Sequence, residues 1–224
     1  MKKLFVFLTV LLVLFVGVGP VLDRVVFPEA EPSAEYYPAE GQTFRSETEG
    51  FTQRIIKRDA GLMWVELTLD PHAEGPPPHV HTGFAELFRV AEGSISLFID
   101  GEVVKLEAGE ERLVPPNTIH RPFNPNDVKA VVAGPLRPQY AMPEKFGVFL
   151  TQAYGYFDES PRNSQPPGAL FQMSRFSPRY DSWLGGPPVS LQRALFWILG
   201  PIARAVGYRS YYPRFAPPKP HEDG

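Results

Sequence analysis

Four side chains in the middle of the chain have the types and spacing of a metal site. His79 and His81 are separated by one residue, Glu86 follows five residues later, and His120 lies further along the chain. In a β-strand, residues two apart point to the same face, so the imidazoles of His79 and His81 can converge on one ion. Three neutral imidazoles and one carboxylate suit a divalent transition metal such as iron, manganese, nickel, copper or zinc. The spacing therefore predicts one such metal held by these four residues.

The size of this ligand set indicates what kind of site it would be. Four protein ligands on a six-coordinate ion leave two positions for substrate, water or dioxygen, whereas a structural zinc site is closed by its protein ligands. Two classes of function stay open. The first is a metal-dependent enzyme, of oxygenase or isomerase type, that acts on a small organic molecule. The second is a non-catalytic small-molecule sensor or binding module, because the sequence identifies no further acid, base or nucleophile.

Other residues near the proposed ligands have ordinary explanations. His72 lies in a proline-rich loop, and His221 lies in the terminal PHEDG segment, so both are interpreted as solvated histidines. By alternation from Glu86, the side chain of Phe88 should point inward. We therefore expect Phe88 to contribute to an apolar cavity beside the metal.

The segment that carries these residues has the pattern of a β domain. From about Phe44 to Gly134, short runs rich in β-branched and aromatic residues alternate with turn residues. Asp100 and Gly101 fall between two runs, where the positive φ angles of a two-residue hairpin turn favour this pair. Strands this short and closely spaced indicate a β-barrel or a double-sheet sandwich. The runs are residues 51–56, 62–69, 84–92, 94–99, 102–107, 111–115, 120–123 and 128–133.

The predicted ligands fall within two motifs that resemble those of the cupin family. The first cupin motif has a glycine, five residues, H-x-H, three or four residues, a glutamate, six residues and a second glycine. His79, His81, Glu86 and Gly93 fit this motif. The first glycine departs from it, because only three residues separate Gly75 from His79.

The second cupin motif has a glycine, five residues, P-x-G, two residues, a histidine, three residues and an asparagine. Gly109, Pro115, His120 and Asn124 fit it, and Asn117 replaces the middle glycine. Asparagine tolerates the left-handed backbone conformation better than most residues, so this replacement is mild. Asn124 either supports His120 from behind or shapes the turn after it.

The resemblance implies a fold, a site and an assembly. Cupins are small jelly-roll barrels, often dimeric. They hold a metal inside the barrel through the two histidines and the glutamate of the first motif and the histidine of the second. This sequence contains all four of these residues. We therefore expect an all-β jelly-roll domain over residues 44–135 that binds a small-molecule ligand or substrate. A homodimer is one assembly that the resemblance implies.

The amino-terminal segment is predicted to be a membrane anchor. No charged residue occurs in Leu4–Leu22, and 19 helical residues at about 1.5 Å each approach the roughly 30 Å hydrocarbon core of a bilayer. A cleaved signal peptide is the alternative, but the glycines before Pro20 make a poor cleavage site. Lys2 and Lys3 precede the segment and acidic residues follow it. The positive-inside rule then places the barrel on the extracytoplasmic side, or outside the cell if the segment is cleaved.

The carboxy-terminal part differs from the β domain. It is predicted to contain a helix at residues 143–157, an irregular stretch at 159–188 and an amphipathic helix at 190–209. Arg193 and Arg204 disfavour the last helix as a second membrane span, so we expect it at the membrane interface or packed on the barrel. This part also resembles the extensions of a group of bacterial cupin proteins.

These observations divide the chain into four parts, and the composition excludes several functions. A net charge of −3 argues against a nucleic-acid binder. The sequence contains no cysteine, which excludes a disulfide framework, a cysteine zinc site and a thiol nucleophile. The 26 prolines exclude a chain made mostly of long helices. The parts are a transmembrane anchor at 1–22, a linker at 23–43, the barrel at 44–135 and a helical, proline-rich extension at 136–224.

Overall fold

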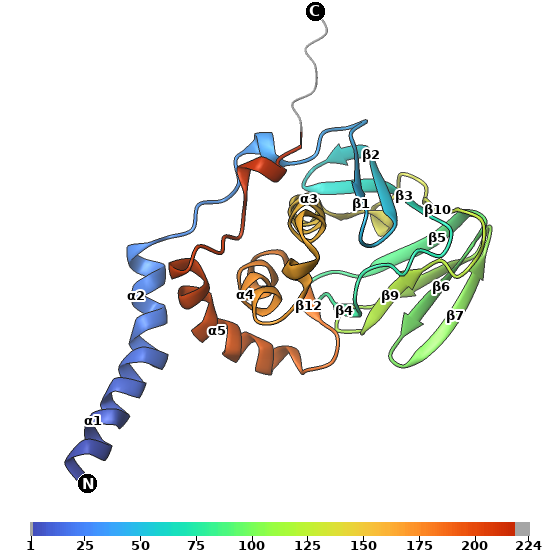
Figure 1. Cartoon of the computed structure of the whole chain (residues 1–224). Helices are drawn as coiled ribbons and strands as arrows, with labels where there is room; N and C mark the ends of the chain where they lie inside the picture. The colour runs from blue at the N-terminus through green and yellow to red at the C-terminus, as the bar shows by residue number, and fades with distance from the viewer. Residues whose placement is uncertain (1, 218–224) are drawn as a thin grey trace, which may run out of the picture.

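The computed structural model describes residues 2–217 and shows an N-terminal helix, a group of three helices and a two-sheet β domain (Figure 1). The longer helices are α1 (Lys2–Val13), α2 (Gly19–Val26), α3 (Glu144–Glu159), α4 (Gly168–Tyr180) and α5 (Val189–Ala205). A π-helical turn at Leu14–Val18 joins α1 to α2. Short 3₁₀ helices lie at Ala34–Tyr36, Pro138–Tyr140, Pro161–Ser164 and Pro213–Phe215.

The strands follow in chain order, and most were predicted from the sequence. They are β1 (Thr43–Ser46), β2 (Phe51–Asp59), β3 (Leu62–Leu69), β4 (His79–Val80), β5 (Glu86–Glu92), β6 (Ser94–Ile99), β7 (Glu102–Glu107), β8 (Glu111–Val114), β9 (His120–Phe123), β10 (Ala130–Val132), β11 (Met142–Pro143) and β12 (Trp183–Leu184). The predicted hairpin turn between β6 and β7 is confirmed, since Asp100 and Gly101 have φ angles of +46° and +98°.

The strands form two antiparallel sheets. The first has the order β1-β2-β3-β10-β5-β8, with β11 paired to β3, and the second has the order β12-β4-β9-β6-β7. The chain passes repeatedly from one sheet to the other. As a result, β9 lies between β4 and β6 in one sheet, and β10 lies between β3 and β5 in the other. The facing surfaces of the two sheets enclose an apolar core. Its fully buried members include Leu69, Val90, Ile95, Leu97 and Ala130.

The predicted all-β class holds for this two-sheet domain, but the sheets are open and do not close into the predicted barrel. The described residues as a whole are mixed, with 39% in helices and 27% in strands. One cause is α4, which lies within the stretch predicted to be irregular. The glycines and prolines that prompted that prediction cluster on either side of α4. The helix itself buries Met173, Phe176 and Tyr180 along one face. Packing of this face decides the outcome, and local composition does not reveal it.

The extension forms a second apolar core against the open side of the sheets. The helices predicted around residues 143–157 and 190–209 correspond to α3 and α5. Phe149, Phe176 and Phe196 from α3, α4 and α5 are buried together in this core. Val80 of β4 and Trp183 of β12 belong to the same core. The extension therefore packs as an integral layer on the β domain, between the sheets and the N-terminal helix (Figure 1).

The N-terminal helix projects away from the rest of the molecule (Figure 1). Among the described residues, Lys2–Val26 is one helix of 25 residues that is long and apolar enough to cross a membrane, judged by length and composition alone. Its most apolar window is only 6% buried within the protein.

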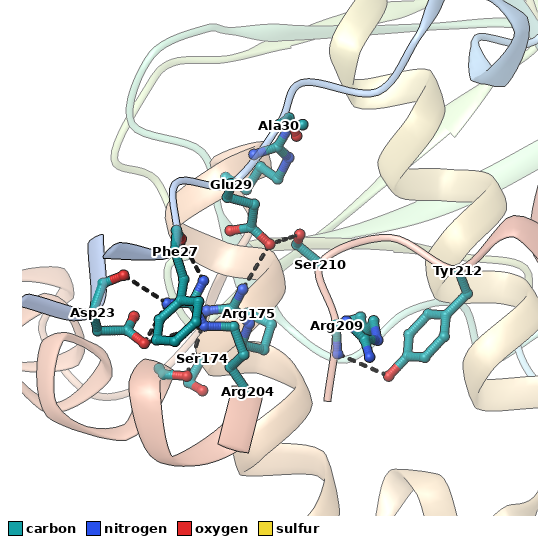
Figure 2. A network of polar contacts seen from close by, with 12 residues as sticks. Asp23, Phe27, Glu29, Ala30, Ser174, Arg175, Arg204, Arg209, Ser210 and Tyr212 are labelled. Atoms are coloured by element: carbon teal, nitrogen blue, oxygen red, sulfur yellow. Dashed lines mark hydrogen bonds and ion pairs between the residues drawn. The ribbon is translucent and has the colours of Figure 1, made fainter. Parts of the chain in front are cut away.

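Polar contacts attach the end of this helix to the extension (Figure 2). Arg204 of α5 forms an ion pair with Asp23 and also donates to the backbone carbonyls of Asp23 and Phe27. Arg175 of α4 pairs with Glu29 at 2.6 Å, and Glu29 also accepts a hydrogen bond from Ser210. The start of the predicted linker is therefore held on α4 and α5.

Candidate metal centre

The structure brings the four predicted ligands together between the two sheets. His79 of β4 and His120 of β9 are directly opposite each other in one sheet, and His81 follows β4. Glu86 begins β5 in the facing sheet. One ligand atom from each of the four residues lies within 4.8 Å of all the others. Strand pairing within one sheet thus brings together His79 and His120, which are 41 positions apart in the chain, and the facing sheet adds Glu86.

Each of the three histidines directs the same ring nitrogen to the centre. Nδ1 lies 3.1 Å from a backbone carbonyl oxygen in His79, 2.7 Å in His81 and 3.0 Å in His120. Because a carbonyl oxygen only accepts hydrogen bonds, all three Nδ1 atoms carry the proton and donate. The Nε2 atoms are consequently the nitrogens available to a metal. Such backbone partners hold the ring orientation of a metal-ligating histidine.

An unpartnered nitrogen shows that this donor set suits a metal. His81 is only 2% exposed, and among the described residues its Nε2 has no hydrogen-bond partner. The nearest carboxylate oxygen, Oε2 of Glu86, is 3.9 Å away. A buried polar atom without a partner is energetically unfavourable. A divalent cation among three Nε2 atoms and the Glu86 carboxylate would remove this cost. The role of these residues as ligands stays a prediction.

Burial and mutual charge determine the protonation of the cluster. Burial, reinforced by His120 and His81, lowers the pKa of His79 to about 3, and burial also lowers the pKa of His81. Burial alone would raise the pKa of Glu86, but the hydrogen bond from His120 and the charges of the histidines lower it to about 2. Burial opposes protonation of His120 as well, yet the hydrogen bond to Glu86 and its charge raise the pKa of His120.

The metal-free cluster is therefore asymmetric. His79 and His81 are neutral at pH 7, while Nε2 of His120 donates to Oε2 of Glu86 at 2.8 Å. This hydrogen bond occupies one nitrogen and one oxygen that a metal would need. Binding must displace the proton on His120 Nε2, as is general for metal sites built from histidine.

Aromatic side chains form the wall around the imidazoles. Phe84 stacks on His81 with ring centres 4.3 Å apart, and Phe146 of α3 meets His81 edge-on at 4.8 Å. Phe88 is buried beside His120 and lines the cavity described below, so its predicted inward orientation is confirmed. Phe146 comes from the extension, which therefore covers the centre directly.

Asp181 is a residue near the centre that sequence reasoning missed. It follows the end of α4 with a φ of +56°, and its carbonyl oxygen accepts the hydrogen bond from Nδ1 of His81. Its carboxylate accepts from the backbone N–H groups of Thr82 and Gly83 at 2.8 and 2.6 Å, and from the Thr82 hydroxyl at 2.6 Å. An aspartate 100 residues from its partner carries no local signal. Only the packing of α4 reveals it.

The structure explains the two positions that depart from the cupin motifs, Gly75 in the first and Asn117 in the second. Gly75 has a φ of +70°, and a Cβ atom there would lie 2.1 Å from the carbonyl oxygen of Pro122, so this position requires glycine despite its unusual spacing. Asn117 adopts the expected left-handed conformation, with a φ of +67°. Its N–H donates to the carbonyl oxygen of His81 at 2.7 Å. Both positions thus retain the loop geometry that supports the ligands.

The remaining candidates lie away from the centre. His72 is exposed, and its Nε2 lies 2.9 Å from Asp127. His221 lies outside the described residues. Asn124 is buried, and its Nδ2 donates to backbone carbonyls of the neighbouring loops, including those of Asp70 and Val128, each at 2.8 Å. Of the two roles considered for Asn124, the structure supports the shaping of the turn.

A cavity of about 500 Å³ opens beside the cluster. His79 and Glu86 form part of its wall. Most of the remaining wall is apolar and comes from both the β domain and the extension, including Phe51, Leu67, Phe88, Phe146, Leu150 and Met173. A concave, mainly apolar space with a few polar groups is typical of small-molecule sites.

The fold and the cluster together define a β-sandwich domain with a candidate metal centre, and comparison with known families finds a match for it. Residues 65–133 match the family described as "Cupin domain", and this match supports the resemblance inferred from the two motifs for this region. Cupin proteins include metal-dependent enzymes and binding proteins. No curated protein matches this chain significantly.

Several solved structures are similar to parts of the chain. KdgF from Halomonas sp. is 24% identical, with a TM-score of 0.36 over 41% of this chain and 83% of that protein. TT1209 from Thermus thermophilus is 19% identical, with a TM-score of 0.36 over 40% and 85% of the two chains. An RmlC-like cupin from Shewanella frigidimarina is 25% identical, with a TM-score of 0.35 over 50% and 96%.

Histidine tautomers provide a test that needs no metal. In the metal-free full chain at pH 7, we expect His79 and His81 to carry a proton on Nδ1 alone, because burial lowers the pKa of both and a carbonyl accepts each Nδ1–H. His120 should titrate above the ordinary value of 6.5. Long-range ¹⁵N–¹H correlation spectra of histidine-labelled protein between about pH 4 and 9 would measure this. A protonated Nε2 on His79 or His81 at pH 7 would contradict the assignment.

Proposed function

We propose that this protein is a membrane-anchored, metal-binding cupin that acts as a metal-dependent enzyme on a small organic molecule. His79, His81, Glu86 and His120 would hold one divalent transition metal, of the group iron, manganese, nickel, copper and zinc. The observation that carries the proposal is the convergence of three Nε2 atoms and one carboxylate within 4.8 Å, beside a cavity of about 500 Å³.

The chain's own residues determine what would reach the metal. When bound, the metal would supply Lewis-acid chemistry, or redox chemistry if it is iron, manganese or copper. Phe84 and Phe146 shield the His81 imidazole from water. The apolar cavity wall holds an organic molecule against His79 and Glu86. A reaction of oxygenase or isomerase type fits this arrangement of an apolar substrate space next to a single ligand cluster.

The alternative is a non-catalytic small-molecule sensor or binding module. It is favoured by the mainly apolar wall of the cavity, which offers few groups that could transfer a proton. Metal content separates the two proposals first, because a protein purified without metal would favour binding alone. Oxygen consumption or conversion of phenolic, diketone and sugar-derived compounds by the metal-loaded protein separates them next.

Replacement of one ligand tests the metal assignment. His120→Ala should reduce metal affinity by at least about 100-fold, since it removes a donor atom from the cluster. The fold should survive, because the apolar core between the sheets does not include this residue. His72→Ala is the matched control and should keep the parent's metal content, as the exposed His72 side chain pairs with exposed Asp127. The measurement is metal per purified full chain. Full retention in His120→Ala, or equal loss in His72→Ala, would refute the ligand set.

Asp181 tests the contribution of the extension. Asp181→Ala removes the acceptor of two backbone N–H groups beside His81 and should lower metal affinity about 10- to 100-fold. Asp181→Asn tolerates the same positive φ and should lower the affinity less. Asp127→Ala, which removes an exposed carboxylate, should leave it unchanged. Competition with a chromophoric chelator would measure the affinities. Equal affinities for the parent and Asp181→Ala would show that Asp181 does not position the site.

Membrane anchoring with an extracytoplasmic cupin domain is part of the same proposal. It is supported by the helix Lys2–Val26, by its exposure, and by Lys2 and Lys3 at its start. A carboxy-terminal reporter that is active only outside the cytoplasm should give signal, and one active only inside should not. The reverse pattern would refute this orientation. The mass of the mature chain distinguishes the anchor from the alternative of secretion after cleavage, and its oligomeric mass tests the proposed homodimer.

A further inference from the structure

A second group of polar side chains lies in the wall of the cavity, apart from the metal centre. Glu49 in the β1–β2 turn, Gln53 of β2 and Tyr154 of α3 all line the cavity. Nε2 of Gln53 donates to the Tyr154 hydroxyl at 2.7 Å, and both side chains are buried. Three separate elements thus place polar groups in an otherwise mainly apolar wall.

This group lies across the first sheet from the metal ligands. Gln53 is in β2, and Glu86 begins β5. The sheet order β2-β3-β10-β5 puts three strand spacings between them, which is about 14 Å along the curved sheet at about 4.8 Å per spacing. A molecule that followed this sheet from one group to the other would therefore be elongated.

Gln53 has an unused acceptor. Its side chain is 6% exposed, and among the described residues its Oε1 is a buried atom without a hydrogen-bond partner. The Tyr154 hydroxyl has a single proton, which it donates to Glu49, so it accepts from Nε2 of Gln53 and leaves Oε1 as the free end of the amide. A buried acceptor left without a partner is costly, so a ligand that brings a donor to Oε1 gains affinity.

Glu49 is held next to a fixed negative charge. Asp158 at the end of α3 accepts from the N–H groups of Glu47 and Thr48 at 2.7 and 2.8 Å, and from the Ser46 hydroxyl. Burial first, and the charge of Asp158 second, raise the pKa of Glu49 to about 8, although a hydrogen bond from Tyr154 opposes this. Near neutral pH the Glu49 carboxyl is therefore mostly protonated and offers an O–H donor.

We propose that Glu49, Gln53 and Tyr154 form a recognition site for the hydroxyl group of an elongated apolar alcohol or phenol, whose other end reaches the metal centre. The hydroxyl donates to Oε1 of Gln53 and accepts from the carboxyl of Glu49. Tyr154 orients Gln53 through its hydroxyl. The inference deepens the proposed function, on which it rests, by naming a substrate class.

Other end groups match this site less well. A plain hydrocarbon leaves Oε1 of Gln53 unpaired. A carboxylate brings no donor and adds a negative charge next to Asp158. An ammonium group brings donors but has no lone pair for the protonated Glu49. A hydroxyl group has one donor and free lone pairs, so it satisfies both residues.

The test compares 4-pentylphenol with pentylbenzene, which differ only in the hydroxyl group. Both are titrated by calorimetry into the full chain in lipid nanodiscs, with empty nanodiscs subtracted, and with pentylamine and 4-pentylbenzoate as further probes. The parent should bind the phenol at least about tenfold more tightly than the hydrocarbon, the amine or the benzoate. This comparison within the parent does not depend on any variant.

Gln53→Met, which keeps the size but removes the acceptor, should abolish the preference for the phenol while leaving hydrocarbon binding and metal content unchanged. Gln165→Met at the exposed surface is the matched control and should keep the preference. A hydroxyl bound to the metal alone would be preferred equally in the parent and Gln53→Met.

The outcomes separate this inference from the proposed function. No preference in the parent, a preference that survives in Gln53→Met, or tighter binding of the amine or benzoate would overturn the hydroxyl site, even if the protein holds one metal. A protein that shows the preference but never binds metal would overturn the proposed metal-dependent function and leave the hydroxyl site standing. If neither the phenol nor the hydrocarbon binds, the hydroxyl site is also overturned.

Discussion

The hydrogen bond from Nδ1 of His81 to the carbonyl oxygen of Asp181 joins the two main parts of this molecule. Its donor belongs to the β domain and its acceptor to the end of α4. The Asp181 carboxylate holds the loop after His81 at the same time. The orientation of one imidazole therefore depends on the extension being folded onto the sheets. A cupin domain without that extension would retain His81 but lose the group that orients its ring.

Burial and mutual charge shift the pKa values of the four candidate ligands in different directions, and the resulting protonation favours binding of a cation. Burial lowers the pKa of His79 and of His81, so both imidazoles stay neutral. The hydrogen bond and the attraction between Glu86 and His120 lower the pKa of Glu86 and raise that of His120. The cluster thus has one carboxylate paired with a removable proton on Nε2 of His120, and unprotonated Nε2 atoms on His79 and His81. A divalent metal compensates the buried carboxylate better than a single proton does.

The extension also connects the site to the N-terminal helix. Arg175 of α4 and Arg204 of α5 bind residues at the end of this helix and just after it (Figure 2). Helix α4 ends one residue before Asp181, which accepts the hydrogen bond from His81. Two residues of α3 line the cavity at different places: Phe146 contacts His81 of the candidate metal centre, and Tyr154 contacts Gln53. The same layer of helices therefore closes the cavity, orients a proposed ligand and holds the helix that is proposed to enter the membrane.

The amino-acid sequence by itself determined the strands of the β domain and the four candidate ligands. Alternating apolar residues and turn pairs such as Asp100-Gly101 are local signals, and the two cupin-like motifs single out His79, His81, Glu86 and His120 by their spacing. Helices α3 and α5 were also predictable, because each has a recognisable start or a continuous apolar stripe.

Only the tertiary structure decided the rest. Helix α4 lies in a stretch whose glycines and prolines conceal it, and it is stabilised by packing of Phe176 against residues distant in sequence. Asp181 depends on that helix, so its contact with His81 could not be inferred either. Glu49, Gln53 and Tyr154 meet in one cavity because a turn, a strand and a helix converge there. Local sequence patterns report periodicity and turn geometry, whereas such long-range contacts arise only when the sheets and helices pack together.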